Sequence, residues 1–78
     1  MNIENKVLTI VSEVLEVELN AINLTTTIDD LDSWDSMMTI NLMTVICDEY
    51  GMMPSFEDFE YFTSVSKIVE FINKNNNL

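Results

Sequence analysis

Apolar residues recur at three- and four-residue steps over residues 3–16, and this spacing restricts the fold more than any other feature of the chain. The stripe consists of Ile3, Val7, Ile10, Val11 and Val14, widened by Leu8 and Leu15. The opposite side carries the polar residues Asn5, Thr9, Ser12, Glu13 and Glu16. The pattern predicts an amphipathic helix over residues 3–16, with Asn2 as its N-cap and Glu4 well placed in the first turn. Such a stripe needs other elements to pack against.

Two later segments show the same period. Residues 37–50 predict a second helix, whose inner face consists of Ile40, Leu42, Met43, Ile46, Cys47 and Tyr50. Gly51 follows directly and suits the left-handed conformation that ends many helices. A last helix is predicted from the stripe Val65, Ile68, Val69 and Ile72. Thr63 or Ser64 is its expected cap, and residues 75–78 are expected to fray.

A short helix is predicted between these two segments. Ser55 opens it, and Asp58 stands three residues later as a variant of the capping box. Its aromatic side chains are expected to close the core: Phe56, Phe59, Tyr61 and Phe62.

Residues 17–34 show neither a helical nor a strand period. Their apolar residues are scattered among Asn, Thr and Asp, which predicts a long loop whose apolar side chains reach the core. A short turn over residues 28–31 is expected, capped by Thr27. The predicted fold is all-α: one domain over residues 1–78, a small four-helix bundle with three longer helices plus one short helix, and a long loop between helices 1 and 2.

The charge of the chain restricts its partners. Fourteen Asp and Glu residues face only three basic residues, so the formal charge is −11. This imbalance disfavours nucleic acids and anionic membranes and favours basic protein surfaces. The single cysteine, Cys47, excludes an internal disulfide, and it is expected to be a small core residue. No signal peptide or membrane span is recognisable, so a cytoplasmic monomer is expected.

The composition also excludes most catalytic chemistry. The chain has no His and a single Gly, so it has neither a Ser-His pair nor a glycine-rich phosphate loop. Asp29 and Asp30 are expected to be solvated charges, because so small a chain has little room for a catalytic pocket. Asp30-Leu31-Asp32 does not continue as a calcium loop, since Asp35 and Asn41 stand where Gly and Glu are required. We therefore expect a non-catalytic protein without a metal site.

The stretch Ser33-Trp34-Asp35-Ser36-Met37 lies where the acidic loop meets the second helix. A Ser or Asp at this point is most often only a helix cap. The residues of this stretch alone do not distinguish a cap from a functional site.

The order of elements and motifs resembles the acyl carrier protein family, the phosphopantetheine-binding four-helix carriers, over essentially the whole chain. The family usually has Asp-Ser-Leu where this chain has Trp34-Asp35-Ser36-Met37, a form that looks like a subgroup of freestanding carriers outside housekeeping fatty-acid synthesis. Two further matches support the resemblance: Glu49-Tyr50-Gly51 and Thr63-Ser64-Val65. The chain departs from the family on the second helix, where Asn41, Thr44 and Cys47 stand in a region that commonly carries acids.

The resemblance implies a carrier that other enzymes modify and load. A phosphopantetheinyl transferase would use Mg²⁺ to move 4′-phosphopantetheine from coenzyme A onto Ser36, next to Asp35. The arm's thiol would then hold an acyl group as a thioester for fatty-acid, polyketide or other secondary-metabolite biosynthesis, with a ligase and synthases as further partners. Two alternatives remain open: an aminoacyl, peptidyl or D-alanyl carrier, and an acidic interaction module without a prosthetic group.

The helical projection also suggests a docking surface. Met37, Asn41, Thr44 and Asp48 fall on the outward face of the second helix and are the predicted partner contacts. Ile40, Met43 and the aromatic residues are expected to line a space for the attached cargo.

Overall fold

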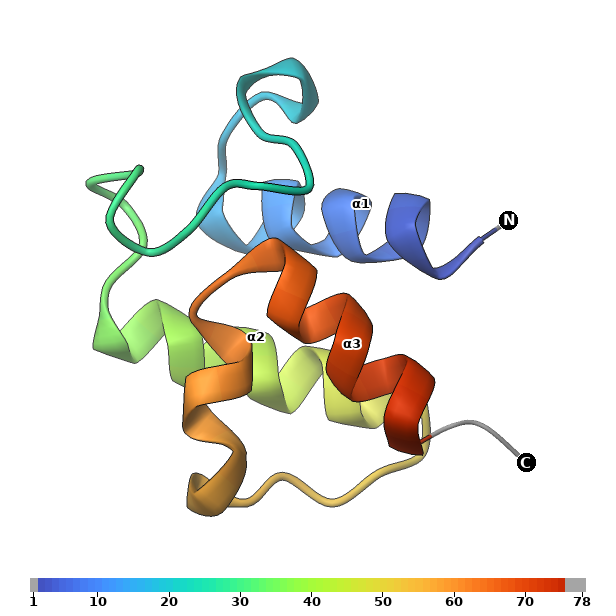
Figure 1. Ribbon diagram of the computed structural model, residues 1–78. Coiled ribbons are helices and arrows are strands. Elements are labelled where there is room, and N and C mark those ends of the chain that lie inside the picture. Colours follow the sequence, from blue (N-terminus) through green and yellow to red (C-terminus); the bar gives the residue numbers. More distant parts are fainter. Residues whose placement is uncertain (1, 76–78) are drawn as a thin grey trace.

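The computed structural model describes residues 2–75. In this range the chain forms the helices shown in Figure 1: α1 (Ile3–Leu15), the 3₁₀-helix η1 (Leu19–Ala21), α2 (Ser36–Glu49), the 3₁₀-helix η2 (Phe56–Phe62) and α3 (Val65–Asn75). The all-α prediction is confirmed, with three longer helices, a short one before the last, and a long connection after the first. The short helix is of the 3₁₀ type, and η1 is a single turn that was not predicted.

Most of the helix caps are formed by the predicted residues. Asn2 accepts a hydrogen bond from the Asn5 amide through Oδ1 at 2.8 Å, and Ser64 accepts one from the Lys67 amide through Oγ at 3.2 Å. Gly51 follows α2 with a φ of 67°. Glu16 was predicted to be helical but adopts a left-handed conformation with a φ of 57°, so α1 ends at Leu15.

Two smaller predictions about helix ends need correction. Asn75 was expected to fray, but it is the last residue of α3 and its Nδ2 donates to the Phe71 carbonyl at 2.8 Å; residues 76–78 lie outside the described part of the chain. Ser55 does cap η2 by accepting from the Glu57 amide. Asp58 returns no side-chain bond to Ser55 among the described residues, so the capping box is only half formed.

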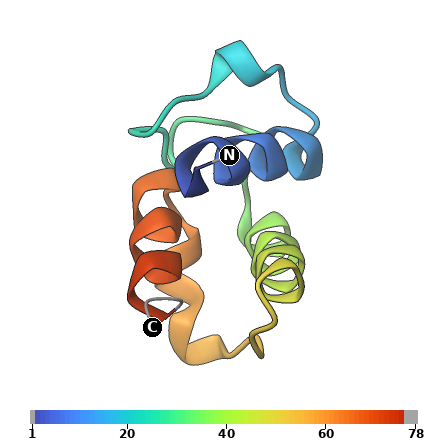
Figure 2. The same cartoon turned by 90° about the vertical axis from the view of Figure 1, so that its right-hand side faces the viewer.

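The core lies where the helices meet. α1 packs against both α2 and α3, and η2 packs against the same two helices. Figure 2 shows α1 lying across, below the loop that carries η1 and above α2 on one side and α3 with η2 on the other. The ring of Phe71 packs 5.1 Å from that of Phe62 and 5.4 Å from that of Tyr61. Phe56 was expected in this aromatic cluster, but it is 77% exposed because it begins η2 at the surface.

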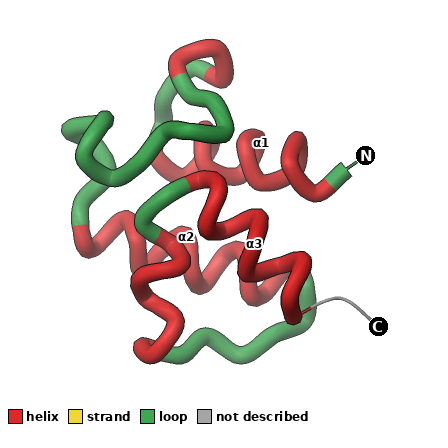
Figure 3. Tube along the Cα trace, in the orientation of Figure 1, coloured by secondary structure: helices red, strands yellow, loops and turns green. Residues whose placement is uncertain are grey.

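Backbone hydrogen bonds join the connection between α1 and α2 to the start of α3. The Ile28 amide donates to the Thr63 carbonyl at 2.8 Å, and the Val65 amide donates to the Thr26 carbonyl at 3.0 Å. Ile22 and Trp34 bury their side chains in the core, as expected of the apolar residues in this loop, but Leu19 and Leu24 are exposed, contrary to that expectation. Figure 3 shows the path of the loop between α1 and α2. The predicted turn is present at residues 28–30, with Thr27 Oγ1 accepting from the Asp29 amide. These contacts fix the position of the connection, which leads directly into the N-terminus of α2.

Candidate functional site

The N-terminus of α2 presents a hydroxyl group to solvent. Asp35 is the N-cap and accepts a hydrogen bond from the Met38 amide through Oδ1 at 2.9 Å. Ser36 is therefore the first helical residue and not the cap, and its side chain is exposed. No hydrogen bond within residues 2–75 engages its hydroxyl. Ser36 therefore does not cap α2, although its position in the sequence also allowed that role.

The backbone around Ser36 is favourable to an anion. The Met38 and Thr39 amides are bonded to Asp35 Oδ1 and to the Asp35 carbonyl, each at 2.9 Å. The amides of Ser36 and Met37 have no acceptor in the described part of the chain, as is usual for the first turn of a helix. Unpaired N–H groups and the positive end of the helix dipole stabilise negative charge at this point.

A buried pair of side chains lies behind this terminus. The indole of Trp34 is 2% exposed and donates through Nε1 to Thr39 Oγ1 at 3.1 Å. Thr39 is fully buried and in turn donates to the Asp35 carbonyl at 2.9 Å. Thr39 was not among the predicted site residues, although its spacing to Leu42, Met43 and Ile46 places it on the buried face of α2. Its hydrogen bond to the indole, in contrast, has no signature in helical periodicity. The available signal was an indole just before the helix and a threonine five residues later.

The predicted docking residues share the exposed side of α2. Met37 is 70% exposed, and Asn41, Thr44 and Asp48 are exposed with it. Val45, which was not predicted there, is 41% exposed as well. The outward face before Asp48 thus carries no charged side chain, although the loop before it and η2 after it are acidic.

A groove runs beside this face. Its volume is about 180 Å³, and its lining comes from α2 and from the segment leading into η2: Ile40, Met43, Thr44, Pro54, Ser55 and Phe56. Ile40 was predicted on the inner face but is 38% exposed, because this side of α2 is only partly covered by that segment. The predicted cargo-lining residues Ile40 and Met43 do line the groove, together with one aromatic residue, Phe56. A larger hollow of about 320 Å³ lies between η2 and α3, but its lining is mostly charged and includes no residue of α2.

Two of the acids near Ser36, Asp30 and Asp35, accept hydrogen bonds from nearby backbone amides. Asp30 accepts from the Thr27 amide through Oδ2 at 2.8 Å, much as Asp35 does for Met38. No three acidic or cysteine side chains of the described ranges converge as a metal site would require. At the other end of α2, Glu49 pairs with Lys6 of α1, and the hydrogen bond raises the pKa of Lys6.

Cys47 is a core residue, as predicted. It is 1% exposed, and burial, with a smaller contribution from the Asp58 charge, raises the pKa of its thiol. Because the thiolate is the reactive form, both factors suppress its reactivity.

We therefore expect the folded apoprotein to react only slowly with Ellman's reagent at pH 8, and a denatured sample to titrate one thiol at once. Since the pKa of Cys47 is higher in the folded state, its contribution to stability is complete below the pKa of the unfolded thiol. That contribution is lost as the pH rises towards the folded value. Rapid reaction of the native protein would show that Cys47 is accessible.

The chain matches proteins whose family is known. A family model described as a phosphopantetheine attachment site matches residues 5–72. An acyl carrier protein of Buchnera aphidicola subsp. Schizaphis graminum is 33% identical over 76 residues, covering 96% of this chain and 95% of that protein. The chain belongs to the acyl carrier protein family. An acyl carrier protein of Buchnera aphidicola subsp. Acyrthosiphon pisum is 34% identical over 76 residues, covering 96% and 94% of the two chains.

Membership of this family implies that the cofactor is covalently attached 4′-phosphopantetheine. The residues at the start of α2 fit such a group, because the exposed hydroxyl of Ser36 and the two adjoining amides have no hydrogen-bond partner among residues 2–75. None of the helices within residues 2–75 is both long and apolar enough to cross a membrane.

Proposed function

We propose that the protein carries an acyl group as a thioester on a 4′-phosphopantetheine arm attached to Ser36. The observation that carries this proposal is the exposed hydroxyl of Ser36 in the first turn of α2, relieved of capping by Asp35. The family match supports the kind of cofactor, and the geometry supports this residue as its attachment point. We further propose that the whole chain acts as one carrier domain in the cytoplasm and catalyses no reaction itself.

The attachment reaction requires only a few groups from this chain. Ser36 Oγ would form a bond to the phosphorus that bears pantetheine, the bond from that phosphorus to the nucleotide of coenzyme A would break, and the hydroxyl proton would pass to a base of the transferase. The chain has no His to act as that base. Its contribution is the nucleophile and, next to it, the amides of Ser36 and Met37, which would stabilise the phosphodiester. When attached, the arm supplies the thiol that holds the cargo.

The groove beside α2 favours an acyl cargo. Ile40, the first lining residue, lies one helical turn beyond Ser36, about 6 Å along the axis at 1.5 Å per residue. The lining combines apolar side chains with two hydroxyls and includes no carboxylate that would pair with the ammonium group of an aminoacyl cargo. This observation supports an acyl chain over the aminoacyl, peptidyl and D-alanyl alternatives.

The proposed partners are a phosphopantetheinyl transferase, an acyl-activating ligase and synthase enzymes. The acidic segments on either side of α2 would attract basic surfaces of these enzymes. The uncharged stretch from Met37 to Thr44 would contact an apolar region at the centre of the enzyme's binding surface.

The proposal is tested by intact mass. Apoprotein incubated with coenzyme A, Mg²⁺ and a transferase of broad specificity is expected to gain the mass of one phosphopantetheine group, and to add none when coenzyme A is left out. If several transferases leave the mass unchanged, the carrier proposal is wrong, and the acidic interaction module becomes the better interpretation.

A separate prediction concerns Met37 as a docking residue. Met37→Ala should leave the unfolding free energy within about 0.5 kcal/mol of wild type, because the side chain is 70% exposed. It should lower kcat/KM for modification by roughly fivefold, the effect of losing about 1 kcal/mol of contact with the transferase. Steady-state kinetics at subsaturating carrier measure the change.

Met53→Ala is the matched control, since Met53 is 87% exposed in the segment after α2 and is not a predicted contact. Equal kinetics for the two variants would remove Met37 from the docking surface. A large loss of stability in Met37→Ala would instead assign it to the core.

A further inference from the structure

The buried pair Trp34 and Thr39 connects the core to the residue immediately before Ser36. One hydroxyl, Thr39 Oγ1, accepts from the indole Nε1 at 3.1 Å and donates to the Asp35 carbonyl at 2.9 Å. That carbonyl also accepts from the Thr39 amide at 2.9 Å. Two hydrogen bonds thus converge on the one carbonyl oxygen that leads into the attachment residue.

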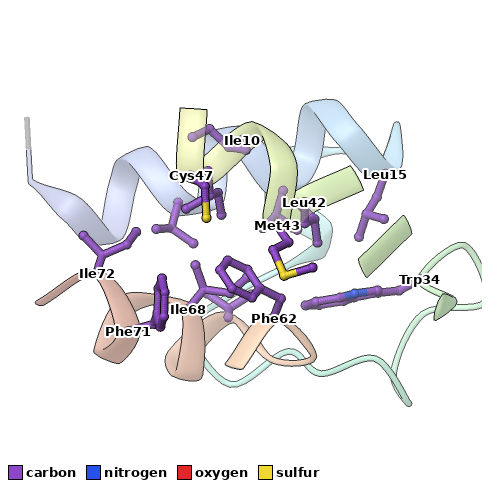
Figure 4. Close-up of a cluster of buried hydrophobic side chains, with 14 of the residues drawn as sticks. Ile10, Leu15, Trp34, Leu42, Met43, Cys47, Phe62, Ile68, Phe71 and Ile72 are labelled. Carbon is purple, nitrogen blue, oxygen red and sulfur yellow. The ribbon is translucent and has the colours of Figure 1, made fainter. Parts of the chain in front are cut away.

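The indole holds this arrangement in place. Figure 4 shows Trp34 at one end of the buried cluster, with Ile72 at the other. Trp34 is 2% exposed and Thr39 is 0% exposed, so neither can move far without breaking core packing or leaving a buried polar atom without a partner. The pair is therefore a rigid support and not a surface contact.

The support acts on Ser36 through the peptide bond. The Asp35 carbonyl and the Ser36 amide belong to one planar unit, so fixing the direction of the carbonyl also fixes that of the amide. The starting point of the Ser36 side chain is then fixed relative to the core. The other end of this first turn is held by the bond from the Met38 amide to Asp35 Oδ1.

We propose that Trp34 and Thr39 are positioning residues for the modification of Ser36, an inference that rests on the proposed function. In that step Ser36 Oγ bonds to the phosphorus, the phosphorus–oxygen bond to the nucleotide breaks, and a base of the transferase receives the proton. Oγ must approach the phosphorus in line with the departing oxygen. A hydroxyl displaced by 1 Å can lower such a rate about a hundredfold.

The decisive variant is Thr39→Val, which keeps the shape of the side chain and removes the hydroxyl. We expect kcat for modification to fall about tenfold or more, since the nucleophile is no longer held in place. KM for the carrier should change little, because the exposed face of α2 is untouched. Thr39→Ser keeps the hydroxyl and should restore kcat. Ile46→Val is the control for lost stability, because Ile46 is fully buried on the same helix and should retain the wild-type kcat.

A second readout is independent of the transferase. Hydrogen exchange of the wild-type apoprotein should be slower at the Thr39 amide than at the Lys6 amide. Each of these amides donates to the carbonyl of its helix N-cap, at 2.9 Å and 3.2 Å respectively, but only the carbonyl of Asp35 also receives a buried side-chain hydroxyl. In the Thr39→Val variant, the backbone amide of residue 39 should exchange faster than in wild type. If that variant does not fold, the double variant Trp34→Phe with Thr39→Val takes its place, because it leaves no indole N–H without an acceptor.

The outcomes separate this inference from the proposed function. If wild type accepts no phosphopantetheine, the attachment proposal fails, and with it the positioning role. If wild type is modified but folded Thr39→Val or the double variant keeps the wild-type kcat, only the positioning role is wrong. An equal loss of kcat in Ile46→Val, or equal exchange of the Lys6 and Thr39 amides in wild type, would likewise overturn it.

Discussion

Replacing Ser36 with alanine is expected to abolish attachment of phosphopantetheine completely. The substitution removes the only atom that would form the new bond to phosphorus, and no residual nucleophile occupies the same place. Intact mass of the variant after incubation with coenzyme A, Mg²⁺ and a transferase should equal that of the untreated protein, while wild type gains one group.

The matched control is Ser33→Ala. Ser33 is also an exposed serine and lies three residues earlier, in the turn before Trp34, so its loss should leave modification unchanged. Attachment that persists in Ser36→Ala, or that disappears in Ser33→Ala, would move the site away from Ser36.

The Ser36→Ala variant should remain folded, so loss of modification will not reflect loss of structure. Asp35 provides the cap of α2 through its bond to the Met38 amide. Alanine also has the highest helix propensity. We expect its unfolding free energy to lie within about 0.5 kcal/mol of that of wild type.

The largest expected effect on stability is that of Phe62→Ala. Phe62 is fully buried and packs edge-on against Phe71 at 5.1 Å, so truncation should cost about 3–5 kcal/mol. Small domains unfold with about 5–15 kcal/mol in total, which means that much of the stability would be lost. Denaturant unfolding followed by the fluorescence of Trp34, the single tryptophan, measures the change.

Phe56→Ala provides the comparison with the same chemical change. Phe56 is 77% exposed at the start of η2, so its truncation should change the unfolding free energy by no more than about 0.5 kcal/mol. Similar losses for the two variants would show that the core does not centre on Phe62.

Periodicity predicted the parts of the fold that depend on apolar burial. Four residues of the α1 stripe are buried as expected, namely Val7, Ile10, Val11 and Leu15, and so are the inner residues Leu42, Met43, Ile46 and Cys47 of α2. The other members of the stripe, Ile3, Leu8 and Val14, are only partly buried against the same core. Ile40 was placed wrongly because the wide apolar arc of α2 exceeds the surface that α1 and η2 cover. Phe56 was placed wrongly because it was expected to join the aromatic cluster of its segment, whereas it begins η2 at the surface.

The candidate site was predictable only in part. Asp35 and Ser36 were predicted from the resemblance of the whole chain to the acyl carrier proteins, since their place before an apolar run fits a helix cap equally well. The four docking residues were predicted from the helical projection. The burial of Thr39 follows from its spacing along α2, but its hydrogen bond to Trp34 could not be predicted, because the connection before α2 brings the indole to it. Hydrogen bonds between a loop residue and a helix residue depend on tertiary structure and leave no periodic trace.

The fastening of the long connection to the start of α3 has a consequence for how the chain folds. The pairs Ile28–Thr63 and Thr26–Val65 join residues far apart in the sequence, so this loop can close only after the C-terminal half of the chain has come into place. Contacts of high sequence separation carry the entropic cost of loop closure and tend to form late. The start of α2 follows this loop in the sequence, so we expect its geometry to become fixed late in folding. We therefore expect a nascent chain to reach the final geometry around Ser36 only after residues 63–65 have been synthesised and have formed their hydrogen bonds to the loop.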